Sequence, residues 1–539
     1  MSSSPSPAAA STEGQAVSRV ENALLSAYDK TGVTDLARAL VKWGATIIAS
    51  GGTAQALREA LIPALSVEDL TGLAPGFGGR VKTLHPNIHA GILARRDVAD
   101  DLAELERAGA RPIDLVYVNL YPFEEAVREG YEEDEKIEKI DVGGPAMLRA
   151  AAKNWKSVAA LCDPEQIPLV IRELEESGGT LSMETRRALA AAAFARTSAY
   201  DRAIARELES GDAVEVRTPS LADQLDVSLE KISDLRYGEN PHQRAALYRR
   251  LDAPGEGLPR GWKVLGGEEL SYNNWVDLAA AAEVVFSLPD PAAVIVKHTN
   301  PCGAATAPTQ EEAWEIARAV DPVSAFGGIA AFNTPLSAET ADRMASLFLE
   351  IVVAPGFTNQ ALARLEKKPR LRIVQVAPES FRARRMEWKT LPGGLYLAQD
   401  DPGRAGDRSE WQVVSKRAPS EDELADLEFA WAVAAAVKSN AIVFARGGQV
   451  LGVGAGQMSR VDSVRIAIEK AKEFGHDLAG SVVASDAFFP FADGPQIALA
   501  AGATAIAQPG GSKRDAETVA AVDEAGAAMV FTGRRVFRH

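Results

Sequence analysis

The stretch Asn-Ala-Leu-Leu-Ser-Ala-Tyr at residues 22–28 decides the fold class of the first part of the chain. It is typical of a buried apolar strand, and Asp-Lys-Thr-Gly at 29–32 separates it from a helical pattern at 33–43. A second apolar strand at 45–49 runs into Ser-Gly-Gly-Thr at 50–53 and then another helix. Strands that alternate with helices indicate a parallel, doubly wound sheet. The sequence therefore predicts an α/β fold for this region.

The same alternation extends along the rest of the chain. Two more strands of the first domain are predicted at 113–118 and 157–161, and a long Ala-rich helix at 183–209 closes it. In the second domain, strands are predicted at 292–296, 327–332, 350–353, 441–445, 481–484 and 503–507. The resulting division is a disordered, Ser-, Ala- and Pro-rich tail at 1–19, a first domain at 20–210, a polar linker at 211–235 and a second domain at 236–539, which splits into two α/β halves near 399–420.

Composition and charge limit the possible functions. Of the 539 residues, 46% are hydrophobic and 24% are charged, which is normal for a globular enzyme. The two cysteines, Cys162 and Cys302, lie beside apolar runs, so we expect no disulfide framework and a cytoplasmic protein. No apolar run reaches the ~18–20 residues of a membrane-spanning helix, so no membrane partner is expected. The net charge of −16 argues against a nucleic-acid partner, but a local cluster of cations can still bind an anionic small substrate.

Two glycine-rich turns have the properties of anion sites. Ser-Gly-Gly-Thr at 50–53 lies between a strand and a helix, where glycines let the backbone approach an anion and the helix N-terminus offers free N–H groups. Asp-Val-Gly-Gly at 141–144 follows the same logic. Taken alone, Ser-Gly-Gly-Thr at 50–53 is better explained as a plain tight turn.

A basic motif, Gly-Arg-Val-Lys-Thr-Leu-His-Pro at 79–86, adds two cations. Arg80 and Lys82 are two residues apart, so in an extended segment both face the same side, as a phosphate or a developing oxyanion requires. His85 and His89 are four residues apart, but Pro86 interrupts a helix there and no third ligand has a known spacing, so we expect no metal site. A solvated basic loop is the alternative for this motif.

The third motif is Val-Lys-His-Thr-Asn-Pro-Cys-Gly at 296–303. Lys297 and His298 follow the apolar run Ala-Ala-Val-Ile-Val, and Asn-Pro-Cys-Gly is predicted to form the turn after them. Open α/β sheets place their chemistry at such strand ends. An exposed polar pair that closes a strand is the alternative, but the chain has only 6 His, and one of the others lies in the unusual run Leu-Arg-Tyr-Gly-Glu-Asn-Pro-His-Gln at 235–243.

These motifs and further blocks occur in the order found in one family. The further blocks are Glu-Leu-Ser-Tyr-Asn-Asn (269–274), Asp-Pro-Val-Ser-Ala-Phe-Gly-Gly (321–328), Lys-Ser-Asn-Ala-Ile (438–442), Gly-Ala-Gly-Gln-Met-Ser-Arg (454–460) and Ser-Asp-Ala-Phe-Phe-Pro-Phe (485–491). From about residue 20 to 539 the chain resembles the PurH family, in which a phosphoribosylaminoimidazolecarboxamide (AICAR) formyltransferase is fused to an IMP cyclohydrolase. The resemblance implies a methylglyoxal-synthase-like first domain, a tandem cytidine-deaminase-like α/β second domain, 10-formyltetrahydrofolate as co-substrate, no metal requirement and a homodimer.

The resemblance also implies roles in the cyclohydrolase half, where a carboxamide nitrogen attacks a formyl carbon and water is lost. Lys82 and Tyr121 would stabilise or protonate the developing oxygen, Asp141 would orient or deprotonate the amide nitrogen, and Lys153 would assist electrostatically. The nucleotide would be held by Ser26, Lys30, Ser50, Gly51, Thr53, Arg80, Thr83 and Asn119. Tyr28 departs from the serine typical of the family, so we assign it no phosphate contact.

In the transformylase half, an aromatic amine attacks the formyl group of the folate. Imidazole titrates near neutral pH, so His298 would accept the amine proton, while Lys297 and the Asn440 amide would stabilise the oxyanion. The nucleotide would contact Arg236, Tyr237, Asn274, Gln457, Arg460 and Arg535. The flat rings would lie against Phe488, Pro490 and Phe491, with Glu350 and Asp493 as acidic candidates on the folate side.

Two other functions are considered for these features. A zinc nucleobase deaminase requires His-x-Glu followed by Pro-Cys-x-x-Cys, whereas Pro301-Cys302 is followed here by Gly-Ala-Ala. A nucleotide-sensing protein without catalysis would explain the glycine turns but would leave Lys297-His298 without a role. The sequence therefore favours an enzyme that formylates AICAR to FAICAR and then cyclises FAICAR to IMP.

Overall fold

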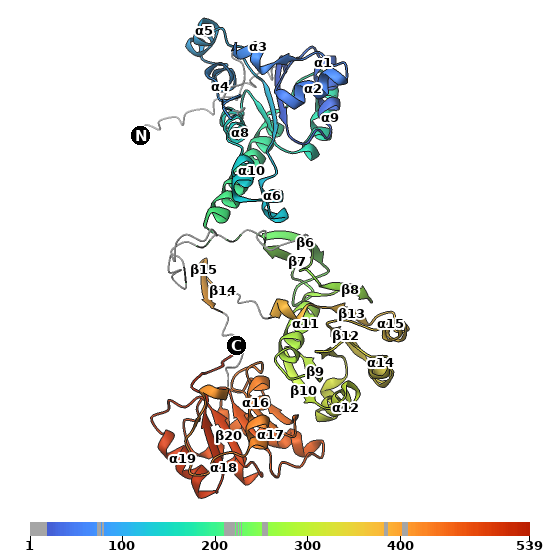
Figure 1. The fold of residues 1–539 in the computed structure, drawn as a ribbon, viewed down its shortest axis with the longest axis vertical. Helices are drawn as coiled ribbons and strands as arrows, with labels where there is room; N and C mark the ends of the chain where they lie inside the picture. The colour runs from blue at the N-terminus through green and yellow to red at the C-terminus, as the bar shows by residue number, and fades with distance from the viewer. Residues whose placement is uncertain are drawn as a thin grey trace, which may run out of the picture. The chain divides into compact units, whose positions relative to one another are not determined.

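The computed structural model describes residues 19–72, 77, 80–209, 221, 225, 227, 229–250, 257–381, 386–400 and 408–539 (Figure 1). Of the tail predicted at 1–19, residues 1–18 lie outside the described residues. The chain divides into two compact units, which we call unit 1, up to residue 216, and unit 2, from residue 217. In the described part of the chain, no helix combines the length and the apolar character needed to cross a membrane.

Unit 1 is built on one five-stranded sheet in the order β3-β2-β1-β4-β5, in which every neighbouring pair is parallel. Its strands are β1 (Asn22–Ala27), β2 (Thr46–Ala49), β3 (Leu65–Ser66), β4 (Leu115–Asn119) and β5 (Ala159–Leu161). The order reverses direction between β1 and β4, which is the topological switch point of a doubly wound sheet. The parallel α/β class predicted for this region is confirmed.

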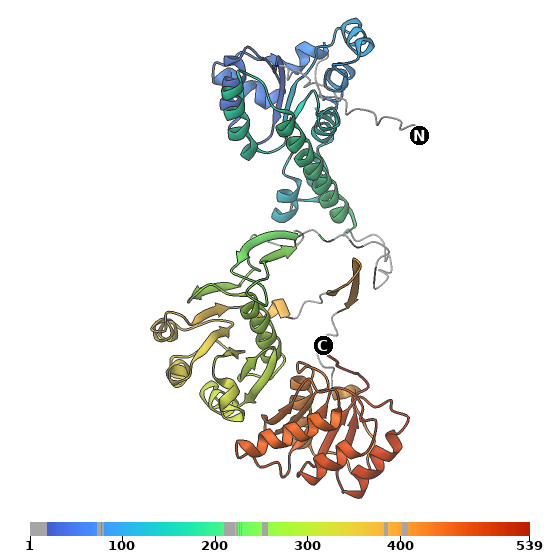
Figure 2. The same ribbon diagram turned by 180° about the vertical axis from the view of Figure 1, so that it is seen from behind.

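Helices cover both faces of this sheet, as Figures 1 and 2 show from opposite sides. One face packs against α1 (Val33–Lys42), α2 (Gly51–Glu59) and α9 (Ile167–Ser177), and the other against α4 (Pro86–Leu93), α8 (Gly143–Lys153) and α10 (Met183–Glu209). Leu24 and Leu25 are both fully buried but belong to the two different cores. Burial on both faces explains why the strands read as continuous apolar runs. Shorter helices complete the unit: α3 (Val67–Thr71), α5 (Ala99–Arg107), α6 (Phe123–Glu129), α7 (Glu133–Glu138) and the 3-10 turn η2 (Pro164–Gln166).

Unit 2 is built on a mixed twelve-stranded sheet in the order β16-β21-β20-β19-β17-β18-β10-β9-β11-β12-β13-β8. The first half contributes β8 (Lys263–Gly266), β9 (Ala292–Lys297), β10 (Asn300–Thr306), β11 (Gly328–Phe332), β12 (Leu349–Ala354) and β13 (Arg372–Gln375). The second half contributes β16 (Gln412–Val413), β17 (Ile442–Arg446), β18 (Gln449–Gly454), β19 (Val482–Ser485), β20 (Ala505–Gln508) and β21 (Ala528–Phe531).

The two halves of unit 2 have the same topology. Each begins with an edge strand and a helix, continues with a hairpin and a second helix, and ends with three parallel strands. The first helices, α11 (Tyr272–Val285) and α16 (Glu421–Ala434), share one core on one face of the sheet. The opposite face is covered by α12 (Gln310–Val320), α14 (Ala338–Arg343) and α15 (Asn359–Leu365) in the first half, and by α17 (Arg460–Glu473), α18 (Asp493–Ala500) and α19 (Asp515–Glu524) in the second. The expectation of two similar α/β halves is confirmed.

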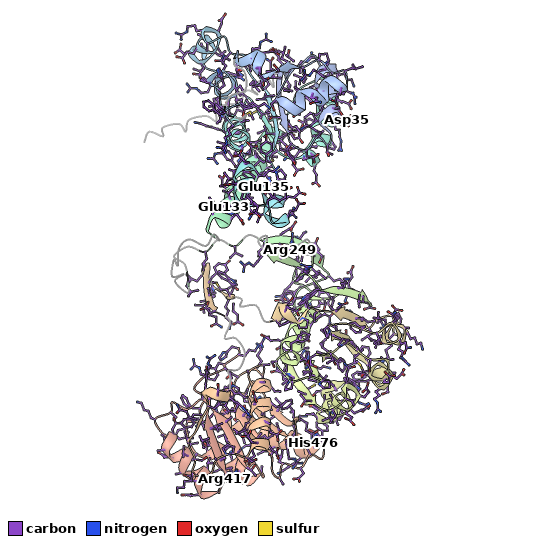
Figure 3. The ribbon with its side chains drawn as sticks, in the orientation of Figure 1. Asp35, Glu133, Glu135, Arg249, Arg417 and His476 are labelled. Carbon is purple, nitrogen blue, oxygen red and sulfur yellow. The ribbon has the colours of Figure 1, made fainter. Side chains whose placement is uncertain are left out.

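The halves meet where the hairpin strands β10 and β18 pair antiparallel, with Ala305 opposite Gln449. His476, labelled in Figure 3, reinforces this seam, because its Nε2 lies 3.1 Å from the carbonyl of Ala319 and 3.2 Å from that of Val320. The seam therefore joins two copies of one fold through equivalent strands.

Two predicted boundaries need correction. The linker predicted at 211–235 ends in a strand, β6 (Leu229–Leu235), which pairs with β7 (Ala245–Arg250). This ribbon is largely exposed and carries ion pairs such as Arg249–Glu230 at 2.6 Å, so its polar sequence resembled that of a loop (Figure 3). The division predicted near 399–420 partly lies outside the described residues; a second ribbon of β14 (Met386–Leu391) and β15 (Leu395–Asp400) precedes it, and the second half resumes at 408.

The turn predicted at Asn-Pro-Cys-Gly was also placed wrongly. Asn300 to Gly303 are the first residues of β10, and the chain reverses at His298 and Thr299 instead. Both residues have left-handed backbones, with φ of 51° and 65°. Non-glycine residues rarely adopt this conformation, so turn propensity pointed to the next residues along the chain.

Candidate active sites

The first candidate site lies at the switch point of unit 1, outside the carboxyl ends of β1, β2 and β4. Ligands of open α/β sheets bind at this position. The Nζ of Lys82 lies so close to the start of α2 that a Cβ atom on Gly51 would overlap it. The Nζ of Lys30 is also near, because a Cβ atom on Gly52 would lie 3.8 Å from it. Two ammonium groups thus converge on a helix N-terminus, an arrangement suited to an anion.

Lys30 is fixed in this position by the loop that follows β1. Its Nζ donates to the carbonyl oxygens of Ala27 and, at 3.0 Å, Tyr28. Burial lowers the pKa of Lys30, and the nearby charge of Lys82 acts in the same direction, while Asp29 opposes them. An anion bound between the two lysines would relieve their repulsion.

The hydroxyl groups of Ser26 and Ser50 also lie at this site. Ser26 and Ser50 lie at the ends of adjacent strands with their Oγ atoms 2.6 Å apart. Ser50 is the N-cap residue of α2, but its side chain makes no capping bond, so it does not occupy the N–H groups of the first turn. Thr53 differs, because its buried Oγ1 accepts from Ala27 N at 3.0 Å and lies 3.1 Å from Ala27 O. The Thr53 side chain, predicted to contact the nucleotide, is hydrogen-bonded in this structure to the backbone of the loop after β1.

The Asn119 side chain, at the end of β4, likewise forms hydrogen bonds that hold the loop after β1. Its Oδ1 accepts from the backbone N–H groups of Tyr28 and Asp29, at 2.5 and 3.0 Å. Its Nδ2 donates to Asp29 O at 2.7 Å and to the Tyr117 hydroxyl at 2.9 Å. Since both ends of the amide are occupied, Asn119 shapes the loop around the site rather than presenting a free group to a nucleotide.

Asp141 lies just before α8 and is held by backbone groups. Its Oδ1 accepts from Gly144 N at 2.8 Å, and its own N–H donates to the Tyr200 hydroxyl at 2.9 Å. Burial raises the pKa of Asp141, although the N–H groups of Gly144 and Tyr121 oppose this. A carboxylate that is harder to ionise is a better proton acceptor near neutral pH.

Tyr121 stands beside this carboxylate as a proton donor. Burial raises the pKa of Tyr121, and the charge of Asp141 adds to the effect, so the phenol keeps its proton. The ring of Tyr28 meets that of Tyr121 edge to face at 5.6 Å between centroids. Tyr28, for which no ligand contact is predicted, therefore supports the position of Tyr121.

Two glycines bring the basic segment and the acidic segment together. A Cβ on Gly143 would overlap Thr83 Oγ1, and a Cβ on Gly144 would overlap Asp141 Oδ2. Thr83, the residue after Lys82, therefore packs directly against the start of α8, beside Asp141. The site thus contains cations, a base with a raised pKa and a phenol donor in one place.

Two predicted members of this site lie elsewhere. Arg80 forms an ion pair with exposed Glu138, because residues 80–84 form turns rather than the extended segment that would have aligned Arg80 with Lys82. Lys153 ends α8, about 15 Å along the helix axis from its start beside Asp141. In the described residues, no three His, Cys, Asp or Glu side chains are grouped as metal ligands.

The second candidate site surrounds the β9–β10 turn of unit 2. Lys297 ends β9, and its Nζ donates to Phe326 O at 2.5 Å and lies 3.4 Å from where a Cβ on Gly327 would be. The segment 321–328, which contains Phe326 and Gly327, thus positions the Lys297 side chain. His298 follows with an exposed side chain on a left-handed backbone. Cation and imidazole therefore project from one fixed turn.

The second half of unit 2 supplies the opposite side. Asn300 connects the two, since its Nδ2 donates to His298 O at 3.0 Å and its Oδ1 accepts from Lys438 N at 2.9 Å. Asn440 lies two residues further on, and its Nδ2 donates to Gln457 O at 2.8 Å and Met458 O at 3.2 Å. The Asn440 donors are thus directed at backbone oxygens in this structure. Asn300 and Lys438 were missed as site residues although both lie inside matching blocks.

Arg460, predicted to contact the nucleotide, is paired with protein groups in this structure. Its Nη2 donates to Asn440 Oδ1 at 2.5 Å, and its Nη1 donates to Ser485 Oγ at 2.8 Å and pairs with Asp486. The Arg460 and Asp486 side chains are only 6% and 0% exposed. The buried guanidinium holds the amide oxygen of Asn440 in place.

A pocket of about 440 Å³ opens beside this turn. It is lined by Leu235, Ala246, Leu247, Tyr272, Trp275, Val276, Ala279, Ala280, Glu283, Thr299, Lys438 and Arg538. Arg236 directly follows Leu235, and its guanidinium stacks on the Tyr237 ring at 5.7 Å. The β6–β7 ribbon, α11, the His298 turn and the C-terminal segment thus share one cavity.

The other predicted residues of unit 2 are less directly connected to this pocket. Asn274 forms the capping box of α11 with Ser271, and one carboxylate oxygen of Glu350 pairs with buried Arg372 at 2.7 Å. Arg535 stacks on Phe537, Gln457 Nε2 donates to Ala455 O, and Asp493 begins α18. Phe488 and Phe491 are exposed, whereas Phe489 between them is in the core.

Comparisons with known proteins agree with both units. The family model of the AICARFT/IMPCHase bienzyme matches residues 151–470, and the MGS-like domain matches residues 32–146. A bifunctional purine biosynthesis protein PurH of Chloroflexus aurantiacus is 51% identical over 525 residues, which are 97% of this chain and 99% of that protein. Proteins of the same description from Neisseria gonorrhoeae and Myxococcus xanthus are 48% and 49% identical, over 97% and 96% of this chain and 100% of each relative. The chain belongs to the AICARFT/IMPCHase family and is a bifunctional enzyme of purine biosynthesis.

Proposed function

We propose that unit 2 transfers the formyl group from 10-formyltetrahydrofolate to AICAR, and that unit 1 closes the product, FAICAR, to IMP. The convergence of Lys82, Asp141 and Tyr121 at the switch point of unit 1 is the observation that carries the second assignment. The fixed Lys297-His298 turn beside the 440 Å³ pocket supports the first.

In formyl transfer, the 5-amino nitrogen of AICAR attacks the formyl carbon and forms a new C–N bond. His298 accepts the proton that this nitrogen loses, and Lys297 stabilises the tetrahedral oxyanion. The intermediate collapses when the bond from the formyl carbon to the folate nitrogen breaks, and that nitrogen takes up a proton. The products are FAICAR and tetrahydrofolate.

In ring closure, the carboxamide nitrogen of FAICAR attacks its own formyl carbon. Asp141 accepts the amide proton, as its raised pKa favours. Lys82 stabilises the oxygen that gains charge, and Tyr121 donates a proton to it. The resulting hydroxyl leaves as water with a second proton, which the former formamido nitrogen gives up as the C=N bond of the purine ring forms. The phosphate is bound by Lys30, the Ser26–Ser50 pair and the start of α2.

The test feeds each substrate separately to the purified full-length chain. AICAR with 10-formyltetrahydrofolate is expected to give IMP, and omission of the folate is expected to abolish it. FAICAR alone is expected to give IMP without folate. A chain that consumes AICAR but leaves FAICAR unchanged would contradict the assignment of unit 1.

We further propose that neither reaction uses a metal, that the enzyme acts in the cytoplasm and that it is a homodimer. Prolonged chelation should leave both rates unchanged, because the described residues offer no ligand cluster to which a catalytic ion is expected to bind. A loss of activity that Zn²⁺ specifically restores would contradict the metal-free assignment.

A further inference from the structure

The two hairpin turns of unit 2 offer a comparison inside one chain. The β9–β10 turn consists of His298 and Thr299, and the β17–β18 turn consists of Gly447 and Gly448. All four residues have positive φ, at 51°, 65°, 61° and 70°. A two-residue hairpin with both φ values positive strongly favours glycine or asparagine. The second half follows this rule, and the first half breaks it with a histidine and a β-branched threonine.

The surroundings of the two turns correspond closely. Lys297 precedes the first turn and donates to Phe326 O, just before β11; Arg446 precedes the second and donates to Ala479 O, just before β19. The same hairpin has therefore been built twice, and the main difference lies in the turn residues.

An aspartate on the preceding helix anchors each turn. Asp277 Oδ1 accepts from Thr299 N at 2.7 Å, and Asp426 accepts from Gly447 N and Gly448 N, both at 2.8 Å. Asp277 lies six residues after the N-cap Ser271 of α11, and Asp426 lies six residues after the N-cap Ser420 of α16. The anchor is thus an equivalent feature of both halves.

The two turns differ in how strongly their left-handed conformation depends on the hydrogen bonds to the aspartate. Glycine adopts a left-handed backbone without a steric penalty, so Gly447-Gly448 keeps its shape from its own preferences. His298 and Thr299 lack that preference and depend on external hydrogen bonds to remain left-handed. A Cβ on Gly447 would have nothing within 4 Å, so open space surrounds this position, and at the equivalent position of the first half the exposed imidazole projects.

We propose that Asp277 is a positioning residue for His298, because its carboxylate holds the His298–Thr299 turn in the left-handed conformation that directs the imidazole. Asp277 acts through the backbone and does not exchange a proton with substrate. The basic side chains that it faces are those of Lys297 and His298. The proposal rests on the assignment of formyl transfer to His298.

The primary test is Asp277→Ala in the full-length chain. A misplaced reacting group costs up to about 100-fold, so we expect kcat for formyl transfer to fall about 10-fold to 100-fold while KM for AICAR changes less than about 3-fold. Ring closure of FAICAR in unit 1 should stay at the wild-type rate, and an unchanged thermal unfolding transition of the full-length chain reports that unit 2 is folded. A wild-type kcat in Asp277→Ala would overturn the proposal.

Two further variants separate positioning from general damage. Thr299→Gly gives a His-Gly turn that favours the left-handed shape by itself, so adding it to Asp277→Ala should restore kcat to within about 5-fold of wild type. Asp426→Ala is the matched control and should leave formyl transfer unchanged, because its turn is already Gly-Gly. Failure of Thr299→Gly to rescue, or an Asp426→Ala defect as large as that of Asp277→Ala, would overturn the proposal.

Asp277→Asn provides the readout if the alanine variant does not fold. An amide oxygen can still accept the Thr299 N–H, so this variant should keep kcat within about 5-fold of wild type. A loss comparable to that of Asp277→Ala would mean that the charge matters rather than the anchor, and would overturn the positioning role. The assignment of His298 itself is tested separately: a His298→Ala chain with normal transfer would remove the proposed function, whereas an inactive His298→Ala beside a normal Asp277→Ala would remove only this inference.

Discussion

The site of unit 1 and the site of unit 2 each combine a cation with a proton acceptor, but they hold these groups in different ways. In unit 2, Lys297 and His298 are neighbours in sequence, and one hairpin turn fixes both. In unit 1, Lys82 and Asp141 come from distant segments, and close backbone approach at Gly51, Gly143 and Gly144 brings them together. A local pair depends on the conformation of one turn, whereas a distant pair depends on the packing of several loops. The two sites should therefore fail independently and in different ways.

The largest effect is expected for His298→Ala. Removing a positioned acid–base group costs about 100-fold to 10,000-fold, so formyl transfer should fall by that factor. Ring closure should be unaffected, because Lys82 and Asp141 remain. Both rates are measured on the same preparation with AICAR and with FAICAR. Equal loss of both rates in a folded chain would end the idea of independent sites.

Lys82→Ala should produce the reverse pattern. Loss of one group that stabilises an oxyanion costs about 100-fold to 1,000-fold, so ring closure should fall while transfer continues. FAICAR should then accumulate when the variant receives AICAR and 10-formyltetrahydrofolate, and chromatography of the reaction detects it. If IMP appeared at the normal rate, Lys82 would have no part in ring closure.

The pH dependence of ring closure should reveal Asp141. Only the ionised carboxylate accepts a proton, so the rate should rise with pH through the carboxyl pKa and fall about 10-fold per unit below it. Because burial raises that pKa, the acidic limb should lie above the range of an ordinary carboxyl group. The measurement is kcat against pH with FAICAR as substrate. An acidic limb at the position of a solvated aspartate would contradict Asp141 as the base.

A smaller effect is expected from Gly51→Ala. The added methyl group meets Lys82 Nζ and also strains a backbone with φ of 36°, so ring closure should fall about 10-fold as the lysine is displaced. Gly109→Ala is a matched control, because Gly109 has φ of 64° but open space around its Cβ position. If both variants behaved alike, backbone strain rather than the position of Lys82 would explain the loss.

The smallest effect is expected from Arg80→Ala. Arg80 and Glu138 form an exposed ion pair, of a kind that contributes less than about 1 kcal/mol. Both kcat and KM for ring closure should stay within about 3-fold of wild type. A KM for FAICAR raised by 10-fold or more would show that Arg80 binds the phosphate, as the basic motif suggested.

Motif order predicted the family and most of the central elements, while it did not predict which partners several of the side chains have in the structure. Asn274 and Arg460 lie in matching blocks but serve as a helix cap and as a buried support. A motif shows that a residue lies near a site but does not show which partner its side chain has. Asp277 was missed although a signal existed: Ser271 and Asp277 have the same six-residue spacing as Ser420 and Asp426.

The sequence by itself determined the α/β class and the adjacency of Lys297 and His298, because apolar periodicity and adjacency are local properties of a chain. Only the tertiary structure decided that Lys82 meets Gly51, that Arg80 does not join it and that Asn119 is fully occupied. These outcomes depend on loop packing between segments far apart in sequence. The pairing of β10 with β18 likewise brings Asn300 against Lys438 and so connects the His298–Thr299 turn of one half to the Asn440 segment of the other. Hydrogen-bond partners are chosen by burial and distance in space, and neither is encoded at the position of a single residue.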